Sequence, residues 1–191
     1  MNYELEQRIR TDLRSDEKLL WMGQPAQGVR FRGSDLFLIP FSLFWAGFAV
    51  YWEWSVIQQG APDFFTLWGI PFVLVGIYIV VGRFFVDAAL RARTYYALTS
   101  ERAVILSGLW TRELKSLWLR NLPELSLKEG PGDRGTIEFG SSPWPMGQWF
   151  RGMSWPGMSR YQPPSFEFID QPRRVYDLLR TAQRDAREVG A

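Results

Sequence analysis

The side chains that most often carry out chemistry are either missing from this sequence or stand far apart in it. The chain of 191 residues has no cysteine and no histidine, which excludes thiolate nucleophiles, disulfides and the most common general base. Four carboxylates stand at the ends of two long apolar runs, where such groups are usually solvated: Asp35, Glu53, Asp63 and Asp87. Only Glu53 and Asp63 are expected to approach each other. The sequence therefore predicts no catalytic residue, no cofactor and no metal site.

The glycine-rich and aromatic motifs also lack the context that catalysis or nucleic-acid binding requires. The glycines of EGPGDRG do not open a helix as a phosphate-binding loop does, and Asp133 in this motif favours a turn. RGMSWPGMSR offers no strong metal donors. Few basic residues lie on the predicted strands, and the net charge is only +2. We expect a protein that is not an enzyme and has neither a nucleic-acid partner nor a small-molecule substrate.

Two uncharged runs, LFLIPFSLFWAGFAVYW and FFTLWGIPFVLVGIYIVVG, have the composition of membrane-spanning helices. About 20 helical residues cross a hydrocarbon core of about 30 Å. We expect spans at about 36–57 and 64–85, in a helical hairpin over 35–86 that turns at Gly60 and Pro62. The alternative is a pair of buried helices in a globular core, which the mostly polar remainder of the chain would have to cover.

Basic residues flank these runs on one side only. Every Lys and Arg lies outside residues 36–82, and the connecting turn has none. The positive-inside rule then predicts that both termini are cytoplasmic and that the turn is extracytoplasmic. The first twenty residues contain no hydrophobic signal region, so the first span is expected to act as an uncleaved anchor. The predicted topology anchors are Arg30, Arg32, Arg83, Arg91 and Arg93.

After the second run, apolar residues alternate with polar ones over short segments bounded by turn residues, which predicts antiparallel strands. Six strands are expected after the hairpin, and KLLWMG supplies a seventh before it. We expect Ile137 and Phe139 to face inward, and likewise Phe166 and Phe168. The predicted strands cover 18–23, 94–98, 103–107, 112–119, 124–129, 136–140 and 165–169.

The chain closes with an amphipathic helix, predicted over 172–187. Pro172 suits its first turn, and one apolar stripe contains Val175, Leu178, Leu179, Ala182 and Ala186. Seven short strands and a covering helix predict an open-ended barrel or an orthogonal sandwich. The fold class is therefore a membrane helical hairpin inserted in a cytosolic seven-stranded β domain.

The hairpin divides the β domain in the sequence. Residues 16–34 are predicted to form the first strand and a linker, and 91–190 the remainder of the domain. Leu5, Ile9 and Leu13 lie on one face of a short amphipathic helix predicted over 1–15. This helix is expected to lie on the membrane or on the domain.

Two motifs resemble those of bacterial membrane proteins that carry a pleckstrin-homology-like domain. They are DEKLLWMGQP before the spans and RTYYALTSERAVILSG after them, with a glutamate at a strand start and a Tyr-x-x-Thr-x-x-Arg hairpin. The resemblance follows the order of elements over nearly the whole chain. It implies a bent seven-stranded sheet capped by a C-terminal helix, and a place in the bacterial inner membrane. No basic motif for phosphoinositide binding is found.

The segment 141–164, SSPWPMGQWFRGMSWPGMSRYQPP, is unusually apolar for a loop. A domain tethered by two spans stays close to the bilayer, so this loop is expected to insert its rings at the interface and to place its arginines near anionic lipid, at about 1 kcal/mol each. Alternatively, the rings cover the barrel or contact a second protein. The predicted docking residues are Trp144, Trp149, Phe150, Arg151, Trp155 and Arg160.

Taken together, these observations predict a non-enzymatic membrane protein whose cytoplasmic domain binds protein or lipid, or acts as a scaffold. The expected partners are membrane lipid and either another protein or a second copy of the chain. The alternative is an accessory subunit of a transporter or an envelope-assembly machine, whose hairpin packs against other spans through Ser42, Ala46 and Gly76.

Overall fold

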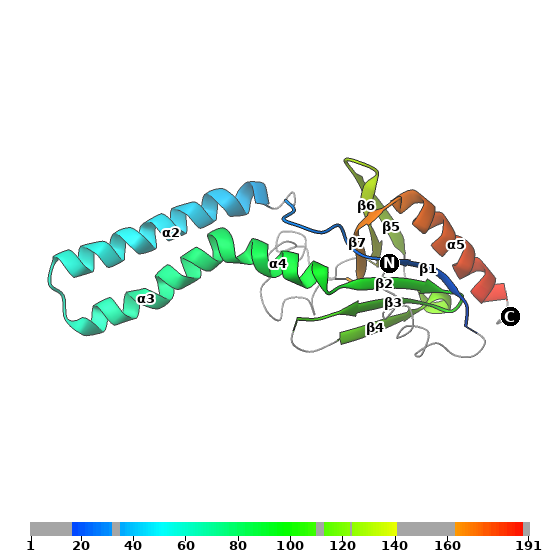
Figure 1. Cartoon of the computed structure of the whole chain (residues 1–191), viewed down its shortest axis with the longest axis horizontal. Coiled ribbons are helices and arrows are strands. Elements are labelled where there is room, and N and C mark those ends of the chain that lie inside the picture. Colours follow the sequence, from blue (N-terminus) through cyan, green and yellow to red (C-terminus); the bar gives the residue numbers. More distant parts are fainter. Residues whose placement is uncertain (1–16, 32–34, 110–112, 123, 141–162, 189–191) are drawn as a thin grey trace. The chain divides into compact units, whose positions relative to one another are not determined.

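The chain combines a β-sheet unit with a helical hairpin unit (Figure 1). The computed structural model describes residues 17–31, 35–109, 113–122, 124–140 and 163–188. Within this part, the sheet unit comprises residues of 17–28, 89–140 and 163–188, and the hairpin unit comprises residues of 29–88. The amphipathic helix predicted over residues 1–15 lies outside the described residues. The hairpin enters the chain between the first and second strands, as the sequence predicts.

Two antiparallel sheets form the sheet unit, one in the order β1-β2-β3-β4 and the other in the order β5-β6-β7. Each observed strand lies within two residues of the predicted one, because the alternating pattern marks which face is buried. The strands are β1 (Leu19–Gly23), β2 (Tyr95–Thr99), β3 (Arg102–Ser107), β4 (Glu113–Trp118), β5 (Leu125–Gly130), β6 (Arg134–Phe139) and β7 (Ser165–Asp170).

Aromatic rings join the two sheets in one core. Phe166 of β7 is completely buried, and its ring centroid lies 4.8 Å from that of Tyr96 in β2 and 4.9 Å from that of Phe139 in β6. Trp21 of β1 contributes a third ring at 5.6 Å. Since β1 and β2 belong to one sheet and β6 and β7 to the other, these contacts hold the inner faces together.

The inward position predicted for Phe168 is wrong. Ile169 is completely buried instead, while Phe168 is half-buried and has a φ of 50°. The register of β6 and β7 shifts between Gly135 and Ile137, and a one-residue shift exchanges the faces of a strand. A Cβ at Gly135 would lie 2.8 Å from Cγ of Pro172, so the backbone approaches closely at the irregularity.

Helix α5 (Pro172–Glu188) covers the core with the predicted stripe. Val175, Leu179, Ala182 and Ala186 are buried in the cluster that contains the rings, and Leu178 packs against it. The stripe recurs at three or four residues, which places it on one face of the helix.

The hairpin unit consists of two long helical segments that are apolar enough, by length and composition, to cross a membrane. The first is α2 (Asp35–Gln58). The second runs without a break through α3 (Asp63–Ile77), a π-helical segment η1 (Tyr78–Gly82) and α4 (Arg83–Ala92), and thus extends seven residues beyond the predicted span. Gly60 has a φ of 61° in the connecting turn, which confirms the predicted turn.

Small residues lie between the helices of the hairpin. Gly76 is buried, and a Cβ built on it would lie 3.2 Å from the backbone Cα of Ala46. Ser42 is also buried, and its hydroxyl donates a hydrogen bond to the carbonyl of Ile39. Ala46 and Gly76, which the sequence offered for contacts with other spans, therefore pack against each other.

A substitution in α5 tests how strongly this helix stabilises the sheets. Leu179→Ala removes a completely buried side chain and is expected to lower the free energy of unfolding by about 2–5 kcal/mol. Arg187→Ala, at an exposed position of the same helix, is the control and should change it by less than about 0.5 kcal/mol. Denaturant unfolding of the detergent-solubilised chain measures both. Equal effects would show that the α5 stripe does not anchor the core.

Candidate functional site

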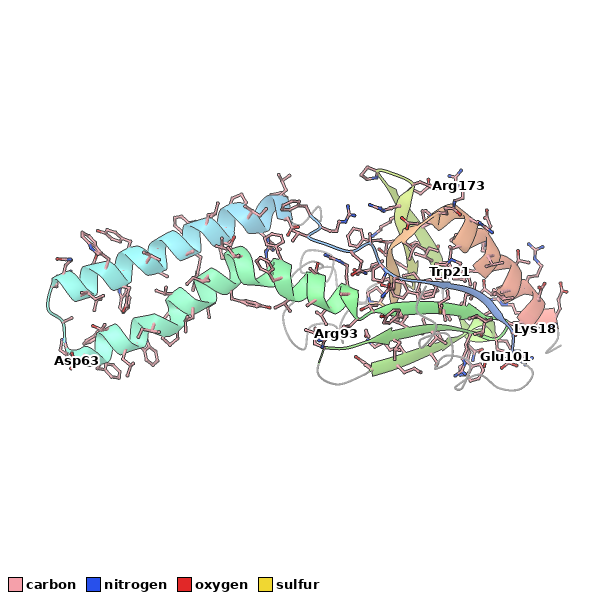
Figure 2. The ribbon with its side chains drawn as sticks, viewed as in Figure 1. Lys18, Trp21, Asp63, Arg93, Glu101 and Arg173 are labelled. Atoms are coloured by element: carbon pink, nitrogen blue, oxygen red, sulfur yellow. The ribbon has the colours of Figure 1, made fainter. Side chains whose placement is uncertain are left out.

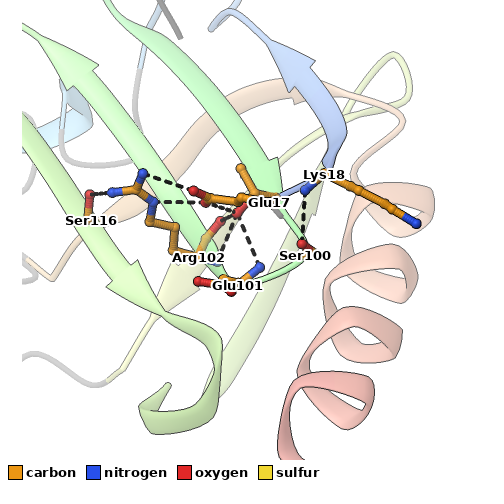
Figure 3. A network of polar contacts seen from close by, with 7 residues as sticks. Glu17, Lys18, Ser100, Glu101, Arg102 and Ser116 are labelled. Carbon is orange, nitrogen blue, oxygen red and sulfur yellow. Dashed lines mark hydrogen bonds and ion pairs between the residues drawn. The ribbon is translucent and has the colours of Figure 1, made fainter. Parts of the chain in front are cut away.

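A buried ion pair lies at one end of the four-stranded sheet (Figure 3). The guanidinium of Arg102 donates two hydrogen bonds to the carboxylate of Glu17, from Nε at 2.9 Å and from Nη2 at 3.0 Å. The Glu17 side chain is 0% exposed. Arg102 Nη1 lies 3.4 Å from the hydroxyl of Ser116, and Trp118 lies beside the guanidinium.

Thr99 completes this cluster. Its hydroxyl donates a hydrogen bond of 2.6 Å to Glu17 and accepts one of 2.9 Å from the backbone N–H of Arg102. The backbone N–H of Lys18 donates to the hydroxyl of Ser100 in the same turn. The motif residues Glu17, Thr99 and Arg102, far apart in the sequence, are therefore direct neighbours.

This arrangement suits a structural role better than catalysis. Both oxygens of the Glu17 carboxylate accept hydrogen bonds, as a buried charge requires, so no free oxygen of that pair faces a substrate. The bonds attach the segment before β1 to the turn between β2 and β3.

A second arginine ties together the two connections that lead to and from the hairpin. Arg91 is 4% exposed, and its Nη2 donates a hydrogen bond of 2.6 Å to the carbonyl of Gly28. The side-chain amide of Gln27 donates to the carbonyl of Arg91, and the Arg91 guanidinium lies over the ring of Phe168 at 5.6 Å. The carbonyl of Phe168 also accepts a hydrogen bond from Ala26. Phe168, whose backbone is in the left-handed region, therefore contacts the two segments that connect the hairpin to the sheet unit.

A third arginine lies within the hairpin unit. Arg83 begins α4 directly after the π-helical segment, and its Nη2 lies 3.0 Å from Oδ1 of Asp35 in the first turn of α2. Both side chains are nearly inaccessible, at 4% and 7%. An ion pair therefore joins the start of α2 to the start of α4.

The outer surface of the hairpin is the most unusual feature of the described chain. More than twenty large apolar side chains of α2, α3 and the following turns are exposed, and Figure 2 shows side chains projecting all around both helices, with Asp63 at the tip. An open apolar hollow on this surface is lined by Leu43, Ala46, Gly47, Val50, Val73 and Ile77, among others. Exposed apolar surface of this extent marks a site of contact with lipid or protein.

Some sequence-predicted site residues can be placed and others cannot. The six docking residues of the loop and Arg32 lie outside the described residues, so these predictions stay open. Arg83 and Arg91 are both buried, and their role as topology anchors stays a prediction. Arg93 is exposed and donates to the carbonyl of Leu109, and Arg30 is half-buried.

Two of the carboxylates at the ends of the apolar runs have contacts within the hairpin unit. Asp35 binds Arg83, and the Glu53 carboxylate packs against Gly69. Among the described residues there is no group of three or more Asp or Glu side chains that could hold a metal ion. Sequence reasoning missed both buried ion pairs. The available signals were the opposite charges that flank the apolar runs, for Asp35 and Arg83, and the two quoted motifs, for Glu17 and Arg102.

Removing one member of the buried pair in the sheet unit tests its structural role. Arg102→Ala leaves the Glu17 carboxylate buried without its cation and is expected to destabilise the chain by about 3–5 kcal/mol. Lys115→Ala breaks the more exposed Lys115–Glu113 pair of the neighbouring strand and should cost less than about 1 kcal/mol. Thermal unfolding in detergent compares the two. Similar, small effects would mean that the cluster does not hold the strands together.

Comparison of the chain with protein-family models, with curated proteins and with solved structures found no match. The exposed apolar hairpin and the buried charged clusters are the features of the described chain that bear on its function.

Proposed function

We propose that this chain is a two-pass protein of the bacterial inner membrane, with both termini in the cytoplasm. Its sheet unit is a pleckstrin-homology-like domain that acts as a non-enzymatic module for binding protein or lipid. Membrane insertion is carried by one observation, the large apolar surface around the hairpin. Only 17% and 11% of the two most apolar helical windows are buried within the chain.

The alternative of a soluble core helix pair is disfavoured by this exposure. Burying one large apolar side chain is worth about 1.5–3 kcal/mol, so more than twenty exposed ones would strongly favour a lipid environment. Trp54 and Trp68 lie near the turn end of the hairpin, where their amphipathic rings suit the headgroup level.

The pleckstrin-homology-like assignment is supported by the sheet unit. Seven antiparallel strands in sheets of four and three, with α5 covering the core between them, agree with the bent sheet and capping helix that the resemblance implies. The cluster of Glu17, Thr99 and Arg102 gives the two quoted motifs a shared physical purpose. The agreement concerns the arrangement of the strands and of α5.

Strand β4 is the best candidate for the protein-binding edge. It is an edge strand of its sheet, and the side chains of Leu114 and Trp118 are 47% and 44% exposed. An unpaired edge can accept a further strand through its backbone N–H and C=O groups, while exposed apolar side chains give specificity.

The accessory-subunit alternative is favoured by the hollow on the hairpin. Gly47 contributes to its lining, and no heavy atom of the described residues lies within 4 Å of the position that a Cβ would take there, so another span has room to approach. A stoichiometric membrane partner in a mild-detergent pull-down would favour this alternative.

Single cysteines test the topology, because the chain has no native cysteine. Gln59→Cys lies in the turn of the hairpin and Thr181→Cys on the exposed face of α5. In intact spheroplasts, a membrane-impermeant maleimide should label the first variant only, and it should label the second after permeabilisation. Equal labelling of both variants in intact spheroplasts would contradict the proposed orientation.

A further inference from the structure

Arg83 has more hydrogen-bond donors than acceptors around it. Its side chain is 4% exposed, and among the described residues its ionic partner is Asp35, which Nη2 reaches at 3.0 Å without hydrogen-bond geometry. Nε and Nη1 have no hydrogen-bond partner among the residues that the structure describes. Leaving the donors of a buried guanidinium unsatisfied costs free energy, so a native chain is expected to supply an acceptor.

The surroundings of Arg83 hold its guanidinium in place. The π-helical segment Tyr78–Gly82 precedes it, and such segments are frequent at functional sites. The guanidinium carbon lies 4.5 Å from the centre of the Phe84 ring, and Phe84 in turn packs edge-on against Phe31 at 5.6 Å. Because it is held between a carboxylate and an aromatic ring, the buried guanidinium has little side-chain entropy left to lose when an acceptor binds.

A second arginine shows the same deficit. Arg30 is half-buried, and its Nε is buried without a hydrogen-bond partner in the described chain. Since Arg30 precedes Phe31 and Arg83 precedes Phe84, the contact between these rings brings the two backbone segments together. Two guanidinium groups with unmet N–H donors therefore occur at the same end of the hairpin.

We propose that Arg83, assisted by Arg30, binds the phosphate of an anionic glycerophospholipid from the cytoplasmic leaflet. This inference rests on the proposed membrane insertion, which places the N-terminal end of α2 and the start of α4 at headgroup level. A guanidinium offers N–H groups in a planar fork that matches two phosphate oxygens. The ligand chemistry is a phosphate monoanion, which either a lipid headgroup or a soluble phosphate can supply.

The local charges favour a singly charged phosphodiester over a multiply charged headgroup. Asp35 and Asp87 lie near the same end of the hairpin unit as Arg30 and Arg83, so two positive and two negative charges occur there. Such a balance disfavours the accumulation of several negative charges, as in an inositol polyphosphate. One phosphodiester can satisfy the free N–H groups of Arg83 without displacing Asp35.

Native mass spectrometry of the full chain, extracted from membranes in mild detergent, tests this inference. The wild type is expected to retain about one anionic phospholipid, and Arg83→Gln to reduce that fraction about tenfold or more, because charge-assisted hydrogen bonds are lost. Arg83→Lys, which keeps the charge but not the fork, should retain an intermediate fraction. Arg93→Gln makes the same charge change at an exposed position and should match the wild type.

A double variant guards against loss of folding. Combining Arg83→Gln with Asp35→Asn removes the carboxylate that Arg83→Gln alone would leave without its cation. This double variant should stay in the membrane fraction and lose the lipid. Retention of the same lipid by the wild type and by this double variant would overturn the inference and leave membrane insertion intact. Recovery of the wild type in the soluble fraction would instead overturn the proposed function itself.

Two further arms separate the sources of phosphate. Wild-type protein in nanodiscs of phosphatidylcholine with a minor fraction of phosphatidylglycerol should retain phosphatidylglycerol in excess of its share. Inorganic phosphate, added to delipidated protein, should give no adduct that depends on Arg83. An Arg83-dependent phosphate adduct without lipid retention would assign the site to a soluble phosphate and overturn the lipid assignment.

Discussion

Apolar side chains on the outside of a helical hairpin have to be removed from water, and this requirement constrains everything else in the chain. At about 1.5–3 kcal/mol for each large side chain, more than twenty exposed ones correspond to tens of kcal/mol. The net stability of a folded domain is about 5–15 kcal/mol. A lipid environment, as proposed for the hairpin, removes this term. The helical form follows, because backbone N–H and C=O groups have no other partners in hydrocarbon.

In the proposed membrane-spanning state, the hairpin cannot use the hydrophobic effect to hold its two helices together. Close packing takes over this role, as in the contact of Gly76 with Ala46, and it is supplemented by the ion pair of Arg83 and Asp35. In the sheet unit, by contrast, the rings around Phe166 and the stripe of α5 are driven together by water. The two units of the chain thus depend on two different kinds of cohesion.

Much of this organisation is local and could be predicted from the sequence. The strands and α5 follow from apolar periodicity, and Gly60 and Asp133 mark turns because both adopt a positive φ. Non-local features could not be predicted. The exchange of Phe168 for Ile169 depends on how Gly135 packs against Pro172, and the pairing of Glu17 with Arg102 depends on tertiary contacts across 85 residues. The continuation of the second long helix to Ala92 was missed because α4 is amphipathic, and its polar face resembles a linker.

Alkaline carbonate extraction followed by flotation is the most direct test of whether the hairpin is dissolved in lipid. Carbonate strips peripheral proteins from membranes, and flotation separates membrane-embedded protein from aggregates. We predict that the intact chain floats with the membranes after the carbonate wash. Release of the intact chain into the supernatant, or its recovery only as sedimenting aggregate, would contradict the account.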